Sequence, residues 1–223
     1  MTPLTWPCPL SGGGTASEYA LAFDKARNRR LLIIPALFDE ANRLRRLTVD
    51  VMRRLDGAGI DTFLPDLPGT NESLQALDKQ EPRDWQNAMT AAAALFGATQ
   101  VLAIRGGCLF APPGLPTLHY APAKAADILR QMLRARMLAA REAGREETRE
   151  TLMALALDEG IELAGYRLGA DFVRGFETME LAADATLISQ DNIGGSGLWL
   201  RAEPGESGSQ ADALAAAVAV TLA

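Results

Sequence analysis

The residues best placed for chemistry follow a short apolar run in the middle of the chain. Val101-Leu102-Ala103-Ile104 has the length of a buried strand, and Arg105-Gly106-Gly107 comes directly after it. A strand that ends in a sharp turn, with small residues two before and two after the central position, frames a nucleophile elbow. Here the small residues are Ala103 and Gly107, so the central position holds Arg105. Because a guanidinium stays protonated, it cannot attack a carbonyl carbon.

A second register would place Cys108 at the centre of the turn, in Gly106-Gly107-Cys108-Leu109-Phe110. A thiolate at that position would be activated by the N-terminus of the following helix. Against this register, Phe110 occupies a position that should be small, and the turn begins late after the strand. Cys108 is therefore a weak catalytic candidate, and a buried structural thiol is the favoured interpretation.

The only histidine, His119, is the other weak catalytic candidate. It lies on the strand that follows the turn, whereas the order nucleophile, acid, histidine would place a general base in a loop near the end of the chain. A lone histidine within an apolar strand is more often a packed core residue. Without a nucleophile and base that can pair, the logic of a catalytic triad fails.

A second turn offers a binding site instead. Pro35-Ala36-Leu37-Phe38 follows the apolar run 31–35 and precedes Asp39, Glu40 and Asn42. This turn and Arg105 would both lie at the carboxyl ends of neighbouring strands, where open α/β sheets bind ligands.

Backbone N–H groups and a guanidinium together suit an anion. The predicted ligand-binding residues are Arg105, Gly106, Phe38, Asp39, Glu40 and Asn42, for a small anionic or acyl ligand. The alternative is that Arg105 forms an internal ion pair with Glu40 or Asp66, with no ligand.

The remaining pattern predicts one α/β domain over residues 1–223, with an extended N-terminal segment over 1–17. Apolar runs predict strands at 19–24, 31–35, 60–64, 101–104, 115–120 and 185–189, with a strand or turn at 161–168. The first two are expected to form a hairpin through the polar residues 25–28. Apolar periodicity predicts helices from 39 to 55, 82 to 97, 170 to 183 and 210 to 223.

Strands that alternate with helices through short connections predict right-handed crossovers and a mostly parallel sheet. Residues 123–156, rich in Ala, Leu, Arg and Glu, predict a helical hairpin broken at Gly144, either covering the sheet or capping a pocket. The expected architecture is an α/β-hydrolase-like three-layer sandwich with a helical hairpin insertion.

Composition excludes several classes of function. The 223 residues carry a formal net charge of -6, which argues against binding to nucleic acid or anionic lipid. Two cysteines and one histidine argue against a disulfide scaffold and a metal site, and no cofactor is predicted. No apolar run reaches the ~18 residues that a membrane span needs, and a cytoplasmic protein is expected.

Several segments resemble a known family, the exosortase A system-associated hydrolases of the second type. The resemblance rests on the stretch from Phe38 to Arg46, on Leu64-Pro65-Asp66-Leu67-Pro68-Gly69, on Asp84-Trp85, on the turn at Arg105, on Ala164-Gly165-Tyr166-Arg167-Leu168, on Met179-Glu180-Leu181 and on Gly197-Leu198-Trp199. It implies an α/β-hydrolase architecture and a link to envelope or exopolysaccharide processes, without a demonstrated reaction. The chain departs from the family by having Ile34-Pro35 where the family often has His-Pro, and by an abbreviated segment between Leu181 and Trp199.

Three hypotheses of function follow. The first is a hydrolase-fold protein without triad chemistry that binds a small anionic or acyl ligand near Arg105. The second is an esterase or thioesterase that uses Cys108. The third is a non-catalytic interaction protein whose helical hairpin contacts a protein partner or a second copy of the chain.

Overall fold

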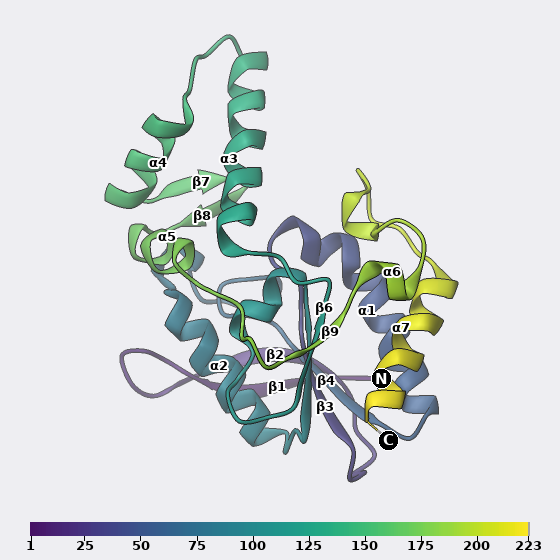
Figure 1. Cartoon of the computed structure of the whole chain (residues 1–223). Helices are drawn as coiled ribbons and strands as arrows, with labels where there is room; N and C mark the ends of the chain where they lie inside the picture. Colours follow the sequence, from purple (N-terminus) through teal and green to yellow (C-terminus); the bar gives the residue numbers. More distant parts are fainter. Residues whose placement is uncertain (223) are drawn as a thin grey trace.

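A seven-stranded sheet runs through the computed structural model, which describes residues 1–222 (Figure 1). Its strand order is β1-β2-β4-β3-β5-β6-β9. Strand β2 is antiparallel to both of its neighbours, β1 and β4, and the five strands from β4 to β9 in this order are parallel to one another. The strands are β1 (Thr2–Pro9), β2 (Thr15–Phe23), β3 (Arg30–Ile34), β4 (Asp61–Pro65), β5 (Gln100–Ile104), β6 (Thr117–Tyr120) and β9 (Thr186–Ile188). The mostly parallel α/β architecture that the sequence predicts is confirmed.

The N-terminal residues contain a strand that the sequence pattern did not single out. Within the segment 1–17, β1 forms a hairpin with β2, and Trp6 lies opposite Glu18. The predicted hairpin between 19–24 and 31–35 is wrong, because β2 pairs with β4 while β3 lies between β4 and β5. The polar connection instead passes the start of β4, where the backbone N–H groups of Lys25 and Arg27 donate to the carboxylate of Asp61.

Two crossover helices cover opposite faces of the sheet. Helix α1 (Asp39–Gly57) follows β3 and packs on one face together with α7 (Gly208–Thr221). Helix α2 (Pro82–Leu95) follows the 3₁₀ turn η1 (Leu77–Lys79) and packs on the other face. The predicted three layers are therefore present. The third connection differs, because a six-residue 3₁₀ segment, η2 (Arg105–Phe110), stands between β5 and β6.

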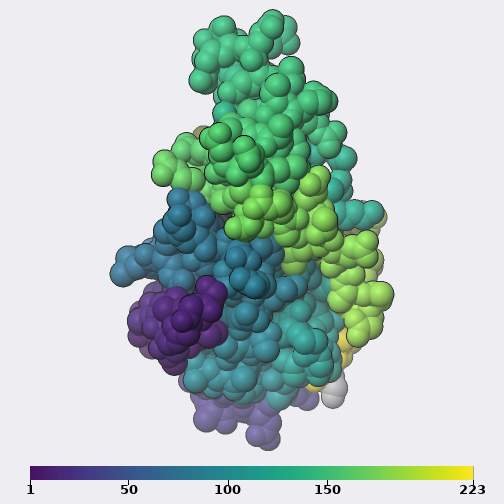
Figure 2. Space-filling model, turned by 90° about the vertical axis from the view of Figure 1, so that its left-hand side faces the viewer, coloured from purple at the N-terminus to yellow at the C-terminus, as the bar shows by residue number. Residues whose placement is uncertain are grey.

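The helical hairpin insertion stands above the carboxyl ends of the strands (Figure 1) and projects from the rest of the molecule (Figure 2). It consists of α3 (Ala125–Glu142) and α4 (Arg149–Asp158), with Gly144 between them at a positive φ of 71°. A small sheet of β7 (Ile161–Leu163) and β8 (Tyr166–Leu168) follows, and then α5 (Ala170–Glu177). We refer to residues 125–177 as the cap. The predicted helix 170–183 is too long, because the apolar stripe that anchors α5 ends at Phe176.

The last part of the chain is short in regular structure. It contains α6 (Gln190–Ile193), the 3₁₀ turn η3 (Leu198–Leu200) and α7, which accounts for the predicted helix 210–223; Ala223 lies outside the described residues. Over the described residues, no helix combines the length and the hydropathy that crossing a membrane requires.

Candidate functional site

The turn after β5 has the backbone of a nucleophile elbow with an arginine at its centre. Arg105 adopts φ 54°, a left-handed conformation that costs a non-glycine residue about 1–2 kcal/mol. A Cβ at Gly107 would lie 2.2 Å from the carbonyl oxygen of Pro35, so only glycine allows this approach to the end of β3. Strained residues of this kind cluster at functional sites, and Phe38 and Ala121 beside it also have positive φ.

The guanidinium of Arg105 is held by groups of the protein itself. Its Nε and Nη2 atoms donate to the two carboxylate oxygens of Glu40, each at 3.0 Å, and Nη1 donates to the carbonyl oxygen of Ala121 at 2.7 Å. The ring of Trp199 lies 4.2 Å from its central carbon, a cation–π distance. Of the two carboxylates proposed as its partner, Glu40 is therefore the one observed.

The second candidate partner, Asp66, is engaged elsewhere. It is fully buried and accepts hydrogen bonds from the side chain of Asn71, at 3.0 Å, and of Arg45, at 3.4 Å. Burial raises the pKa of this carboxyl group, and these hydrogen bonds oppose the rise. Asp66 thus holds the loop after β4 and does not contact Arg105.

The space directly above the turn is filled. A Cβ at Gly106 would lie 2.7 Å from Cδ1 of Ile128 in α3 and 2.9 Å from the side chain of Leu37. Ile128 of the cap and Leu37 of the β3–α1 turn therefore pack closely against Gly106, the residue after the elbow position.

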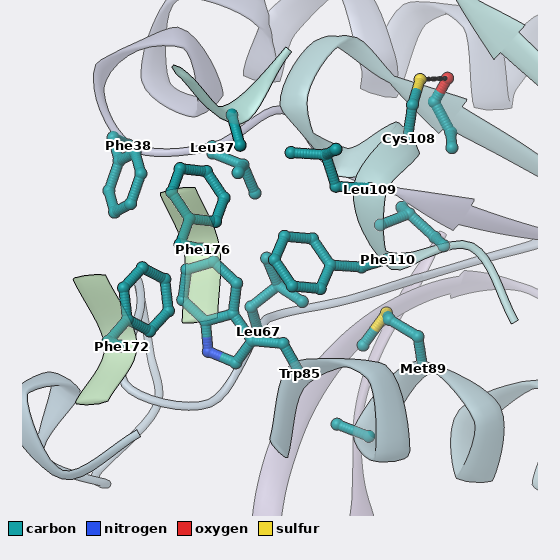
Figure 3. Packing of buried hydrophobic residues seen from close by; sticks show 14 of the residues in the cluster. Leu37, Phe38, Leu67, Trp85, Met89, Cys108, Leu109, Phe110, Phe172 and Phe176 are labelled. Carbon is teal, nitrogen blue, oxygen red and sulfur yellow. Dashed lines mark hydrogen bonds between the residues drawn. The ribbon is translucent and has the colours of Figure 1, made fainter. Parts of the chain in front are cut away.

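Cys108 points away from any accessible surface. Its Sγ donates to the carbonyl oxygen of Ala103 at 3.2 Å, and the residue is 1% exposed. In Figure 3 it lies at one end of the apolar cluster, with Phe38 at the other. Burial raises the pKa of the thiol, which Arg105 lowers only in part. A thiol in this environment stays protonated and inert.

His119 is a core residue of β6. It is 3% exposed and lies between Ala103 of β5 and Leu187 of β9 in the sheet register. Burial lowers the pKa of its imidazole, which Asp184 opposes. No hydrogen bond between described residues joins His119 to Cys108, so these residues form no nucleophile–base pair.

The β3–α1 turn leaves backbone donors free. Phe38 is the N-cap of α1, with φ 53° and ψ −134°, and its side chain provides no capping hydrogen bond. Among the described residues, the backbone N–H groups of Leu37 and Phe38 have no acceptor. Helix N-termini are normally capped by Ser, Thr, Asp or Asn. A Phe at this position leaves the first helical N–H groups, those of Asp39 and Glu40, without a side-chain acceptor, and they add to the free donors of Leu37 and Phe38.

Two pockets flank Phe38. The larger has a volume of about 280 Å³ and the smaller about 120 Å³. The larger is lined by Pro35, Ala36, Leu37, Phe38, Ala41, Asn42, Leu67, Thr70, Asn71, Trp85 and Tyr166. The smaller is lined by Leu37, Phe38, Asp39, Glu40, Arg43, Ile128, Gln131, Met132, Ala135 and Ala164.

The residues predicted from the sequence to bind a ligand are distributed between the two pockets, and two of them line neither. Phe38 and Asn42 line the larger pocket, and Phe38, Asp39 and Glu40 line the smaller one. Arg105 and Gly106 line neither.

The larger pocket brings in two aromatic residues, Trp85 and Tyr166, which are part of the family resemblance but were not assigned to the site from the sequence. Trp85 comes from the first turn of α2, and Tyr166 comes from the cap. The pair Ala164-Gly165 was a usable signal for Tyr166, because both residues have the positive φ of a two-residue hairpin turn and so fix the position of the strand that follows.

The lining of the larger pocket contains no charged side chain. Its polar groups are the amides of Asn42 and Asn71 and the hydroxyls of Thr70 and Tyr166. Burial, with a further contribution from Asp39, raises the pKa of Tyr166, so its hydroxyl keeps its proton at neutral pH. Over residues 1–222, no cluster of three or more His, Cys, Asp or Glu side chains suits a metal ion.

Comparison with known proteins identifies the fold and no family. No protein-family model matches the chain, and no curated protein matches it in sequence. Among solved structures, a protein of Agrobacterium vitis S4 is similar with a TM-score of 0.54 and 14% identity over 100% of both chains. The α/β hydrolase GrgF of Penicillium sp. sh18 has a TM-score of 0.52 and 13% identity, covering 85% of this chain and 80% of its own.

A thermophilic esterase of Thermogutta terrifontis has a TM-score of 0.51 and 11% identity over 85% and 80% of the two chains. Similarities at these identities show the fold alone. The chain has an α/β-hydrolase fold, distantly related in structure to esterases and other hydrolases.

Proposed function

We propose that this protein uses the α/β-hydrolase fold to bind a small anionic or acyl ligand in the larger pocket, without triad chemistry. The observation that carries the proposal is the uncapped turn at Phe38, whose free N–H groups belong to residues that line a pocket with neutral walls. A carboxylate or carbonyl oxygen is the acceptor that suits such donors best, and the N-terminus of the 19-residue helix α1 favours a negative charge.

Two features support binding over hydrolysis. The elbow position carries a guanidinium that is already paired with Glu40, and Ile128 and Leu37 pack against the next residue, Gly106. The only thiol near the turn and the only imidazole are buried and unconnected. The ligand then lies beside the elbow, at the ends of β3 and β4, and meets no nucleophile there.

The proposal can be tested by measuring how carboxylates of increasing size raise the melting temperature. Ala41 lines the larger pocket from the first turn of α1, so Ala41→Leu should fill part of it and abolish the ligand-induced shift. Ala94→Leu, on an exposed position of α2, is the matched control and should keep the shift. A panel of carboxylates and acyl amides that shifts neither the wild type nor the control would overturn the proposal.

The role of Arg105 is tested in the same assay. Because its guanidinium is paired internally and lines neither pocket, Arg105→Ala should lower the melting temperature but keep the shift that a carboxylate produces. Loss of the shift in Arg105→Ala, with the fold intact by circular dichroism, would instead make Arg105 the anion anchor.

The resemblance to the exosortase-associated proteins extends the proposal to the cell. It rests on the residues of the Phe38–Arg46 turn and of the Arg105 turn. On that basis we propose a role in envelope or exopolysaccharide processes. Deletion of the gene in its host should change the amount or length of exopolysaccharide, and an unchanged polymer would remove this part of the proposal.

A further inference from the structure

We infer that the ligand of the larger pocket is an aromatic carboxylate, whose ring lies against Phe38 and Tyr166. This inference rests on the proposed function, which places the carboxylate at the turn, and adds the chemical class of the rest of the ligand. It follows from the composition of the pocket wall and from the unused polar groups along it.

Three aromatic side chains from three separate elements meet at this pocket. The rings of Phe38 and Tyr166 pack edge to face, with centroids 5.1 Å apart and an interplanar angle of 66°. The rings of Phe38 and Trp85 are 6.1 Å apart and tilted by 46°. Because aromatic rings prefer edge-to-face and offset contacts, a wall of differently tilted rings offers a flat ring both edges and faces.

The indole of Trp85 has no free polar group to offer. Its Nε1 donates to the carbonyl oxygen of Pro68 at 2.8 Å, and the residue is fully buried. Trp85 therefore supports the wall of the pocket from behind Phe38 and exposes no surface of its own to a ligand. The ring surface that a ligand can contact belongs to Phe38 and Tyr166.

Tyr166 lines the pocket and belongs to the cap. Its position is fixed by the two-residue turn Ala164-Gly165 at the tip of the β7–β8 hairpin. No hydrogen bond among the described residues engages its hydroxyl, which is protonated at neutral pH. A polar substituent on the ligand ring that reaches this hydroxyl can accept its hydrogen bond, while the carboxylate accepts from the turn.

The volume limits the ligand to one ring. About 280 Å³ is just below the range of roughly 300–1,000 Å³ that holds drug-sized ligands. A single-ring acid of about ten non-hydrogen atoms is expected to bind with a Kd on the order of 0.1–1 mM.

The experiment compares carboxylates of matched size by isothermal titration calorimetry and saturation-transfer NMR. Benzoate, phenylacetate and 4-hydroxyphenylacetate form the aromatic set, and cyclohexanecarboxylate and hexanoate form the aliphatic set. Each aromatic pair contributes a factor of roughly 2 to 10 in affinity, so the aromatic set should bind about tenfold more tightly. 4-Hydroxyphenylacetate should bind more tightly than phenylacetate.

Variants of Tyr166 separate the two contributions. Tyr166→Phe should keep the aromatic preference and remove the advantage of 4-hydroxyphenylacetate, whereas Tyr166→Leu should reduce the aromatic preference to about twofold or less. Tyr19→Leu, on β2 and outside the pocket lining, is the matched control and should bind like the wild type.

The possible outcomes distinguish the inference from the proposed function. Equal affinity for benzoate and cyclohexanecarboxylate overturns the aromatic class while leaving carboxylate binding in place. An aromatic preference that persists in Tyr166→Leu overturns the placement of the ring. Binding of none of the five acids overturns both, because the turn then holds no carboxylate.

Discussion

Replacing Glu40 with Gln would leave the guanidinium of Arg105 charged but without its carboxylate. The two side chains are 16% and 14% exposed, and they meet through two parallel hydrogen bonds of 3.0 Å. The reciprocal change, Arg105→Met, removes the cation and its contact with Trp199 but keeps the carboxylate at the N-terminus of α1. Together with the double variant, these changes form a complete thermodynamic cycle.

The expected size follows from burial. Breaking a fully buried ion pair costs about 3–5 kcal/mol, whereas an exposed pair contributes about 0–1 kcal/mol. For a pair that is mostly buried, we expect Glu40→Gln and Arg105→Met each to lower the free energy of unfolding by about 2–3 kcal/mol. Because the double variant leaves no unpaired charge, it should cost clearly less than the sum, with a coupling energy of about 1.5–2.5 kcal/mol.

The assay is equilibrium unfolding in urea at pH 7 for the four proteins of the cycle. The exposed pair Asp127–Arg130 on α3 is the control, since its side chains are 51% and 62% exposed. The cycle with Asp127→Asn and Arg130→Met should give a coupling below about 0.5 kcal/mol. A coupling between Glu40 and Arg105 that is no larger than this control would refute the pairing in solution and return Arg105 to the set of ligand-binding residues.

Three further predictions concern single residues. Burial raises the pKa of Cys8 to about 12 and also raises that of Cys108. Neither thiol should therefore react with a disulfide reagent at pH 8 until urea unfolds the chain. Prompt reaction of the native protein would contradict this prediction. Burial lowers the pKa of His119, so the unfolded chain takes up a proton at a higher pH than the folded chain does. The free energy of unfolding should therefore fall as the pH is lowered from 7.5 to 5.5, by at most about 1.4 kcal/mol per pH unit. His119→Gln should remove this slope in urea titrations, and a slope that remains shows another origin. Gly107→Ala should lower the free energy of unfolding by at least about 3 kcal/mol in the same assay, because the new Cβ would meet the backbone of Pro35. Gly57→Ala places its Cβ in open space and should cost less than about 0.5 kcal/mol. Equal effects of the two changes would contradict the close contact at Gly107.

Local patterns were enough to predict the core of the fold. The apolar runs at β3, β4 and β5 and the periodicity of α1 and α2 are each contained within a few neighbouring residues. The register of the turn at Arg105 also followed from local spacing. The position of β2 beside β4 did not, because pairing between strands distant in sequence leaves no trace in either strand alone.

The candidate site depended on contacts that no local pattern contains. Glu40 and Asp66 are both acidic residues beside strand ends, and the sequence did not show which of them pairs with Arg105. In the structure Asp66 accepts hydrogen bonds from Arg45 and Asn71, and Glu40 pairs with Arg105. The filling of the turn by Ile128 depends on how the cap sits over the sheet. The position of Tyr166 at the pocket also depends on how the cap sits over the sheet. The sequence therefore predicted the turn of the site but not the aromatic residues of the pocket.

The outermost strand, β1, carries prolines at positions 3, 7 and 9. A proline within a strand is tolerated where its nitrogen faces solvent, so these three positions present carbonyl oxygens but no amide hydrogens at the free edge. A strand from another molecule needs alternating donors and acceptors to add to a sheet, and here most of the donors are missing. At the opposite edge β9 spans only three residues, which is little length for a strand to align against. The ends of the sheet thus resist the edge-to-edge association that leads to aggregation.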